Sequence, residues 1–213
     1  PAEPDSGIRF RRIDLEGAPE VSADVDNVVG SALGTTLSAG EAKVLTVEHV
    51  IASLVSLSID NVIIELDGPE IPIQDGSFQD YVEALVEAGV VEQDKEAEVM
   101  KLSGPVHVGG EPGSPSYVAT PSEGLRISAT IDFVHRAIGR SYGSFVIDEA
   151  GFRSELAPAR TFGFKADGER LHAQGLALGL GHAGDPGANH GVNLVHILDA
   201  GIVGQEAGIG GQV

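Results

Sequence analysis

The chain of 213 residues contains no cysteine, which excludes a disulfide framework and every metal site built on thiolates. Histidine and carboxylate side chains must therefore bind any metal. The sequence also lacks an apolar run approaching the roughly 18 residues of a membrane-spanning helix, and its start lacks a basic-then-apolar signal pattern. These absences predict a cytoplasmic protein. Because the chain begins at Pro1 rather than at a methionine, it stays open whether it is a fragment.

Cations are scarce, with 13 Lys and Arg against 32 Asp and Glu and a formal charge of −19. This balance argues against nonspecific nucleic-acid binding, which depends on cations that neutralise phosphates. A nucleotide-sugar diphosphate needs only a few local cations, and four arginines lie in the middle of the chain: Arg126, Arg136, Arg140 and Arg160. We therefore expect no nucleic-acid partner, whereas a small phosphorylated ligand is compatible with the composition.

The stretch from Thr46 to Ser77 opens with an amphipathic helix pattern. Thr46 is a candidate N-cap, and apolar residues follow at helical spacing: Val47, Val50, Ile51, Leu54 and Val55. On a helical wheel His49 lies roughly opposite this stripe and Glu48 lies at its edge. We therefore expect a carboxylate and an imidazole side by side in the first turn, facing away from the core.

An imidazole beside a carboxylate suits metal-assisted hydrolysis. Neutral imidazole binds zinc well, and a carboxylate that does not bind the metal can take a proton from metal-bound water. However, a Glu-His dipeptide at a helix start is more often a solvated first turn, with the Glu favoured by the helix dipole. Alone, Glu48 and His49 are thus a weak signal.

The wider stretch is far more specific. Its matching segments are Thr46-Val47-Glu48-His49, Asp60-Asn61, Asp67-Gly68-Pro69-Glu70-Ile71-Pro72-Ile73 and Asp75-Gly76-Ser77. Together they closely resemble the zinc-dependent UDP-3-O-acyl-N-acetylglucosamine deacetylases, which catalyse an early committed step of lipid A biosynthesis. The resemblance implies a Zn²⁺ cofactor, His49 as a zinc ligand and Glu48 as the general base.

The resemblance continues into the second half, through Ile131-Asp132-Phe133 and Ala159-Arg160-Thr161-Phe162-Gly163-Phe164. It implies that Thr161 polarises the substrate carbonyl or holds the oxyanion, a role that a hydroxyl donor can serve. It also implies that Phe162 borders the substrate, an acylated UDP-N-acetylglucosamine. Without the family match, a threonine in an ordinary packed turn is the more frequent situation.

The remaining zinc ligands are less clear, because the family's His-Lys-x-x-Asp motif is altered here. Aligned on Ile197-Leu198-Asp199-Ala200, Asp199 matches the zinc-binding Asp, Val195 stands in place of the ligand His, and His196 stands in place of the Lys. His196 and Asp199 are three residues apart, so on a helix both could reach one ion. His182 and His190, in a glycine-rich loop, are looser alternatives.

The expected fold is α+β, because in each half strand patterns come first and helix patterns follow. A strand is predicted at residues 8–13, at a sheet edge, and another at residues 62–66. A capping box of Ser77 and Asp80 opens a second helix that ends near Gly89. The charged run at residues 92–98 predicts a boundary between a first domain, 1–97, and a second, 98–213. The resemblance implies two similar halves, each a small mostly antiparallel sheet with helices, packed helix to helix.

Two functions stay open. The first is a monomeric zinc hydrolase that removes the N-acetyl group, with no transmembrane segment and at most transient contact with a membrane surface. The second is a catalytically impaired homologue that keeps the fold and binds nucleotide-sugar. The intact segments at residues 46–49 and 160–164 favour the first. The altered motif at Val195, the lack of a later histidine in residues 201–213 and a tail at residues 175–213 that holds 11 of the 29 glycines favour the second.

Overall fold

The computed structural model describes residues 1–31, 34–111, 113–134 and 138–161, and all statements below refer to these. The first half contains two three-stranded sheets. One has the order β2-β1-β6, formed by Ile8–Arg12 (β1), Glu20–Ser22 (β2) and Val62–Leu66 (β6). The other has the order β3-β4-β5, formed by Val28–Gly30 (β3), Thr36–Ala39 (β4) and Ala42–Val44 (β5). A 3₁₀ turn at Val25–Asn27 precedes β3.

Strand β1 is the centre of its sheet, so the prediction of an edge strand was wrong. It pairs antiparallel with β2 and parallel with β6. The arginines that suggested an exposed edge are paired across the sheet instead. Arg9 Nε lies 2.6 Å from Glu20 Oε2, and Arg11 donates to Glu20 on one side and Glu65 on the other. Two arginines at alternate positions of a central strand are stable here because they form ion pairs with carboxylates on the neighbouring strands.

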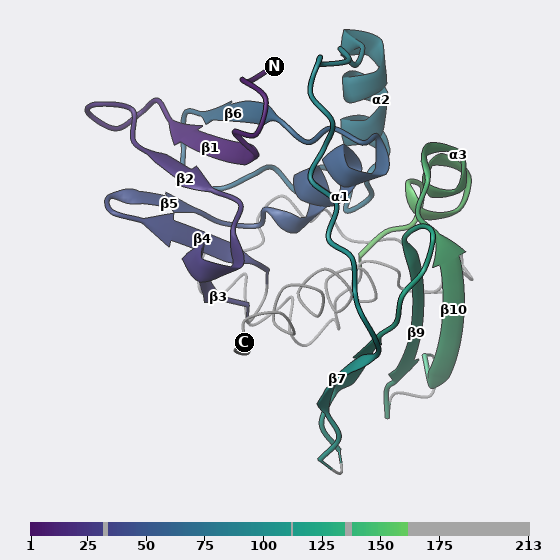
Figure 1. Cartoon of the computed structure of the whole chain (residues 1–213). Coiled ribbons are helices and arrows are strands. Elements are labelled where there is room, and N and C mark those ends of the chain that lie inside the picture. The colour runs from purple at the N-terminus through teal and green to yellow at the C-terminus, as the bar shows by residue number, and fades with distance from the viewer. Residues whose placement is uncertain (32–33, 112, 135–137, 162–213) are drawn as a thin grey trace.

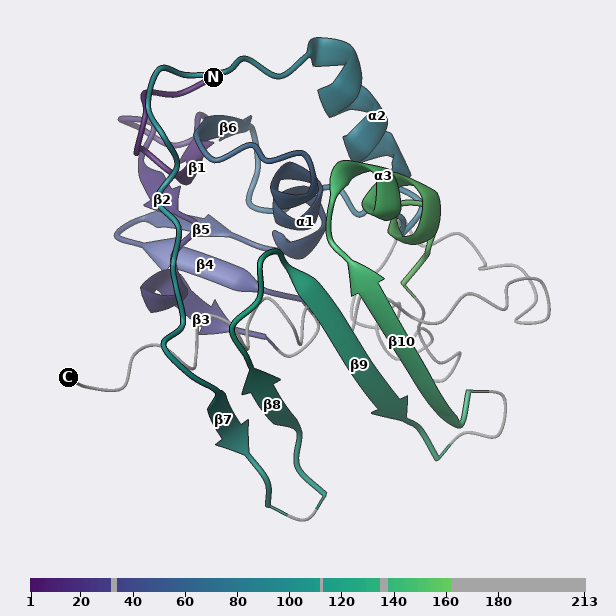
Figure 2. The same ribbon diagram turned by 45° about the vertical axis from the view of Figure 1, so that its right-hand side comes forward.

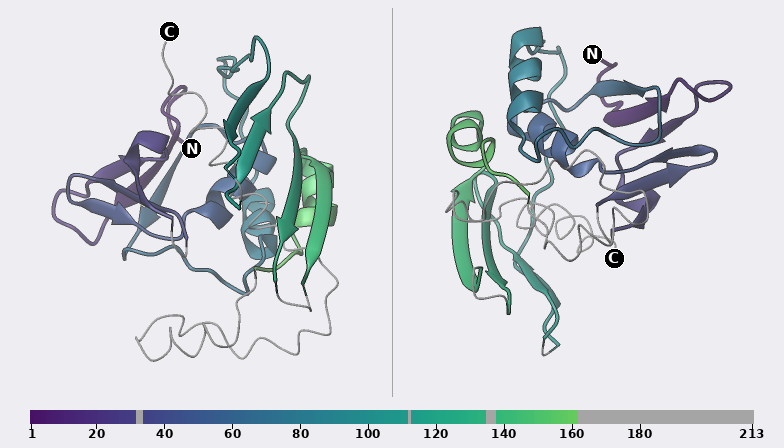
Figure 3. Two further views of the ribbon diagram at one scale, coloured as in Figure 1. Left: turned by 90° about the horizontal axis from the view of Figure 1, so that it is seen from below. Right: turned by 180° about the vertical axis from the view of Figure 1, so that it is seen from behind.

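Two helices follow, Glu48–Ser56 (α1) and Gln79–Ala88 (α2), and they lie between the first-half sheets and the second half (Figures 1 and 3). Helix α2 ends at Gly89, whose φ of 81° confirms the predicted glycine stop. The predicted capping box was wrong: the Ser77 amide and hydroxyl both donate to Asp75 Oδ1, at 3.0 and 2.6 Å, rather than pairing with Asp80. Because Asp75 forms a local turn with Ser77, the Ser77 amide is already bonded and does not donate to Asp80.

The second half contains two antiparallel hairpins, Val106–Gly109 (β7) with Ser116–Ala119 (β8) and Arg126–Asp132 (β9) with Arg140–Val146 (β10) (Figure 2). A helical turn at Glu149–Gly151 (α3) and a π-helical segment at Phe152–Leu156 follow. The α+β prediction is therefore confirmed. The charged run at residues 92–98 contains no helix or strand; the domain boundary placed there stays a prediction.

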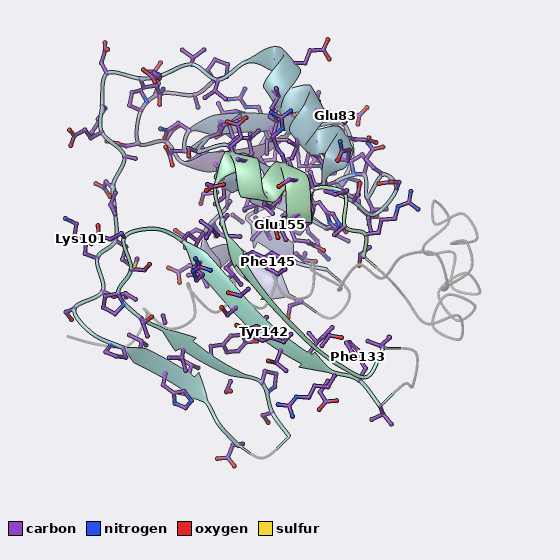
Figure 4. All side chains as sticks on the ribbon, turned by 90° about the vertical axis from the view of Figure 1, so that its right-hand side faces the viewer. Glu83, Lys101, Phe133, Tyr142, Phe145 and Glu155 are labelled. Atoms are coloured by element: carbon purple, nitrogen blue, oxygen red, sulfur yellow. The ribbon has the colours of Figure 1, made fainter. Side chains whose placement is uncertain are left out.

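Buried apolar residues form two clusters. The first-half cluster, packed between the sheets and α1, consists of Phe10, Val21, Leu37, Ala42, Val44, Val47, Val50, Leu54 and Ile71. The second cluster joins the halves and consists of Ala52, Phe78, Val82, Phe152, Leu156 and Ala157. On β10, Phe145 packs against this second cluster, whereas Tyr142 is 66% exposed (Figure 4). Helix α1 contributes to both clusters and is therefore the element around which the two halves pack.

Candidate active site

The start of helix α1 differs from the prediction. Thr46 has a left-handed backbone, with φ of 60°, and its hydroxyl donates to Glu70 Oε1 at 3.0 Å. The N-cap is Val47, which makes no side-chain cap bond. Thr46 is therefore not the N-cap. The reason is tertiary: Leu45 pairs with the segment at Pro69–Ile71, and this pairing directs the next side chain toward Glu70.

Glu48 and His49 are buried, so the prediction that they face away from the core was wrong. Only 9% of Glu48 and 1% of His49 is exposed, whereas Val55, predicted on the apolar stripe, is 41% exposed. The second cluster covers the side of α1 that the helical wheel assigned to solvent. Phe78 packs its ring on the His49 ring, with centroids 5.1 Å apart and planes tilted by 35°. A helix between two layers is buried on two sides, and a wheel drawn from one stripe identifies only one of them.

The Glu48 carboxylate is held by the backbone that precedes β4. Its Oε2 accepts a hydrogen bond from the Thr35 amide at 2.9 Å. A Cβ placed on Gly34 would lie 3.0 Å from Glu48 Oε1, so the backbone there approaches the carboxylate closely because glycine has no side chain. The carboxylate is thus fixed in position while remaining an acceptor, which a general base requires.

The His49 imidazole is buried without a hydrogen bond to any described residue at either Nδ1 or Nε2. Burial lowers its pKa below the usual range, and this exceeds the opposite effects of the Glu48 charge and of the Gly76 backbone, which lies near the ring without meeting hydrogen-bond geometry. Burial thus favours the neutral form of the ring. Buried polar atoms are almost always paired in native proteins, so two unpaired ring nitrogens indicate a missing partner. A neutral imidazole nitrogen with a free lone pair is suited to a metal ion.

The structure brings Thr161 to the turn beside His49. The Thr161 amide donates to the Gly76 carbonyl at 2.7 Å, and its methyl group lies 3.1 Å from where a Cβ on Gly76 would stand. The Phe78 amide donates to the Ala157 carbonyl at 3.0 Å. Residues 76–78 therefore contact α1 through the Phe78 ring and the second half through backbone bonds. The predicted oxyanion donor, Thr161, and the predicted metal ligand, His49, therefore both contact this turn.

The other predicted site residues, Phe162, His196 and Asp199, lie outside the described residues, as does Val195. Within the described ranges no group of three or more His, Cys, Asp or Glu side chains could hold a metal. The described part of the chain thus supplies one candidate ligand, His49, and one candidate base, Glu48.

The sequence did not indicate a role in the site for Asp75, for the Gly34-Thr35 backbone or for Phe78, which was predicted only to lie on the apolar side of the second helix. Asp75 and Gly76 belong to a segment that resembles the deacetylase family, so the sequence pointed to this segment but not to the residues that it contacts. The contact between Gly34 and Glu48 has no sequence signal, because it depends on a strand connection folding back onto the helix start.

No helix among the described residues is both long and apolar enough to cross a membrane. A sequence model of the UDP-3-O-acyl N-acetylglycosamine deacetylase family matches residues 1–183. Curated relatives named UDP-3-O-acyl-N-acetylglucosamine deacetylase, from Brucella ovis, Brucella canis and Brucella melitensis, are each 42% identical over 179 residues, which is 84% of this chain. The matched region spans 62% of the length of these relatives.

Proposed function

The chain belongs to the UDP-3-O-acyl N-acetylglycosamine deacetylase family, and we propose from this that it is a zinc-dependent hydrolase. Its substrate is a UDP-3-O-acyl-N-acetylglucosamine, its products are acetate and the free amine, and the step belongs to lipid A biosynthesis in the cytoplasm. His49, Glu48 and Thr161 are the described residues that take part, and the chain acts as a monomer.

One observation carries the proposal: His49 is buried at 1% exposure with both ring nitrogens unpaired among the described residues, directly after Glu48. A structural histidine in a core normally donates one N–H to a carbonyl or carboxylate. The unpaired, neutral ring fits a zinc ligand better than it fits a packing role. His196 and Asp199, from the altered motif, are the proposed companion ligands.

The side chains divide the proposed reaction among them. Zinc, when bound, supplies Lewis-acid activation of water and of the amide carbonyl. Glu48, fixed by the Thr35 amide, accepts the proton of the attacking water at its carboxylate and can return it to the leaving amine. The Thr161 hydroxyl donates to the oxygen that becomes negative as the amide is attacked. Burial of Glu48 and His49 keeps bulk water away from the proton transfer.

Val195 favours a second function, a catalytically impaired homologue that keeps the fold and binds nucleotide-sugar. It stands where the family has a zinc-ligating histidine. For the enzyme to be active, His196 would have to replace that ligand. Whether it does so decides between the two functions.

The test is acetate release from UDP-3-O-acyl-N-acetylglucosamine by the full chain supplied with zinc. Glu48→Gln should reduce the release by roughly two to four orders of magnitude, and Glu87→Gln, a change to an exposed carboxylate on α2, should leave it unchanged. A rate of release that Glu48→Gln does not reduce would assign proton transfer to another group. No release from the unaltered chain, together with retained binding of the UDP-sugar, would establish the impaired homologue.

A further inference from the structure

The turn at residues 75–78 is connected to the second half at three successive points, across more than 70 positions of sequence. Two are the backbone bonds from Thr161 to Gly76 and from Phe78 to Ala157. The third is an ion pair, in which Arg160 Nε and Nη2 donate to Asp75 Oδ2 at 3.1 and 2.6 Å. The ion pair is the only one of the three made by side chains, and it immediately precedes Thr161 in the chain.

Asp75 uses its two carboxylate oxygens for two different tasks. Oδ1 accepts from the Ser77 amide and hydroxyl and so closes the turn around Gly76. Oδ2 accepts from both Arg160 nitrogens and so holds the residue next to Thr161. These bonds lower the pKa of Asp75, the Ser77 hydroxyl being the largest cause and Arg160 a smaller one. One side chain therefore fixes both sides of the contact between Gly76 and Thr161.

We propose that Asp75 and Arg160 are positioning residues for the hydrolysis, which hold the Thr161 hydroxyl in register with His49 and Glu48. The inference rests on the proposed function, in which Thr161 meets the developing oxyanion. The pair acts through the Gly76 carbonyl, which accepts from Thr161 on one side while its turn packs against the His49 ring through Phe78 on the other. Neither Asp75 nor Arg160 needs to touch the substrate.

Because the Asp75–Arg160 pair is exposed, its effect on the geometry of the site can be measured apart from its effect on the free energy of folding. The side chains of Arg160 and Asp75 are 54% and 44% exposed. Ion pairs exposed to this degree contribute little to the free energy of folding, because solvent screens them and side-chain entropy opposes them. Geometry at an active site is more sensitive, since misplacement of a catalytic group by about 1 Å can cost roughly a hundredfold in rate. Breaking the pair should therefore change the site while leaving the fold nearly as stable.

The experiment compares Arg160→Met, Arg160→Lys and Asp75→Asn in the full chain with Arg153→Met as a matched control. Arg153 also pairs with a carboxylate, Glu149, and is 48% exposed, but its partner belongs to α3 and not to the turn at residues 75–78. The first readout is hydrogen exchange of the Thr161 amide by NMR, which needs no catalytic activity. The second is kcat and KM for acetate release, and the third is the thermal unfolding midpoint.

We expect Arg160→Met and Asp75→Asn to raise the Thr161 exchange rate by roughly tenfold, as local opening becomes easier when charge-assisted bonds are lost. Arg160→Lys should restore part of the protection, because an ammonium can reach one oxygen but cannot bridge as the guanidinium does. kcat should fall by roughly ten- to a hundredfold with KM nearly unchanged. Arg153→Met should change neither quantity.

Unchanged Thr161 exchange in Arg160→Met, or an equal change in Arg153→Met, would overturn the proposal. So would equal losses of kcat in Arg160→Met and Arg160→Lys with no difference in exchange. Should the unaltered chain release no acetate, the proposed function fails while the exchange data still decide whether the pair positions Thr161. If Asp75→Asn does not fold, Arg160→Met tests the same contact from the other side.

Discussion

Replacing Gly76 with alanine perturbs the contact on which the site depends. Gly76 has φ of +83°, a left-handed conformation that costs an L-residue about 1–2 kcal/mol. The added Cβ would lie 3.1 Å from Thr161 Cγ2, inside the ordinary carbon–carbon separation of about 3.5–4.0 Å. Displacing a packed neighbour adds about 1–3 kcal/mol. We therefore expect Gly76→Ala to lower the free energy of unfolding by about 2–5 kcal/mol in urea denaturation.

Gly17 provides the matched control. Its φ of +77° is nearly the same, but a Cβ placed there meets nothing within 4 Å among the described atoms. Gly17→Ala should therefore show the backbone cost alone, about 1–2 kcal/mol, and should leave acetate release unchanged. Gly76→Ala should reduce that release because Thr161 moves. Equal losses of stability in the two variants would refute the reasoning, since the contact with Thr161 would then contribute nothing.

Three further predictions concern the proposed base Glu48, the core residue Phe78 and the ion pairs that Glu20 makes with two arginines on β1. Glu48→Gln should reduce acetate release by roughly two to four orders of magnitude with zinc content unchanged, measured by kinetics and metal analysis; full retention of the rate would exclude this carboxylate as the base. Phe78→Ala removes the ring that joins the two halves and should cost about 3–5 kcal/mol in urea denaturation; a loss below about 1 kcal/mol would show that the ring is not core. The pKa of Glu20 is lowered chiefly by its hydrogen bond from Arg9 and then by that from Arg11, so its contribution to stability is present above its ordinary pKa of 4.5 and is lost as the pH falls through its lower folded value. Stability curves of the unaltered chain and Glu20→Gln should therefore converge in acid, and a constant difference from pH 7 to pH 3 would contradict this.

Local patterns predicted the regular elements well. Strand β6 covers Val62–Leu66, as its apolar run and the following Asp-Gly-Pro indicated, and Gly89 ends helix α2. These features depend on propensity, periodicity and turn chemistry within a few residues, which the sequence contains directly.

The position of the site could be only partly predicted, because its environment is made by distant segments. The pairing of Leu45 with residues 69–71 turned Thr46 away from the helix, and Phe78 covered the side of α1 that the pattern assigned to solvent. His49 was thus identified by resemblance but placed on the wrong surface. The sheet position of β1 failed for a similar reason, since its arginines are neutralised by carboxylates on β2 and β6. Such contacts follow from tertiary packing and have no local signature.

Zinc affinity of the full chain and its His49→Gln variant tests the central claim most directly. His107, exposed on β7, provides the control His107→Gln, which keeps the histidine count of the variant the same. If the buried, unpaired His49 ring is a metal ligand, competition titration should show zinc binding that His49→Gln weakens by more than roughly a hundredfold and that His107→Gln leaves unchanged. Equal zinc affinity in the unaltered chain and His49→Gln would contradict the account.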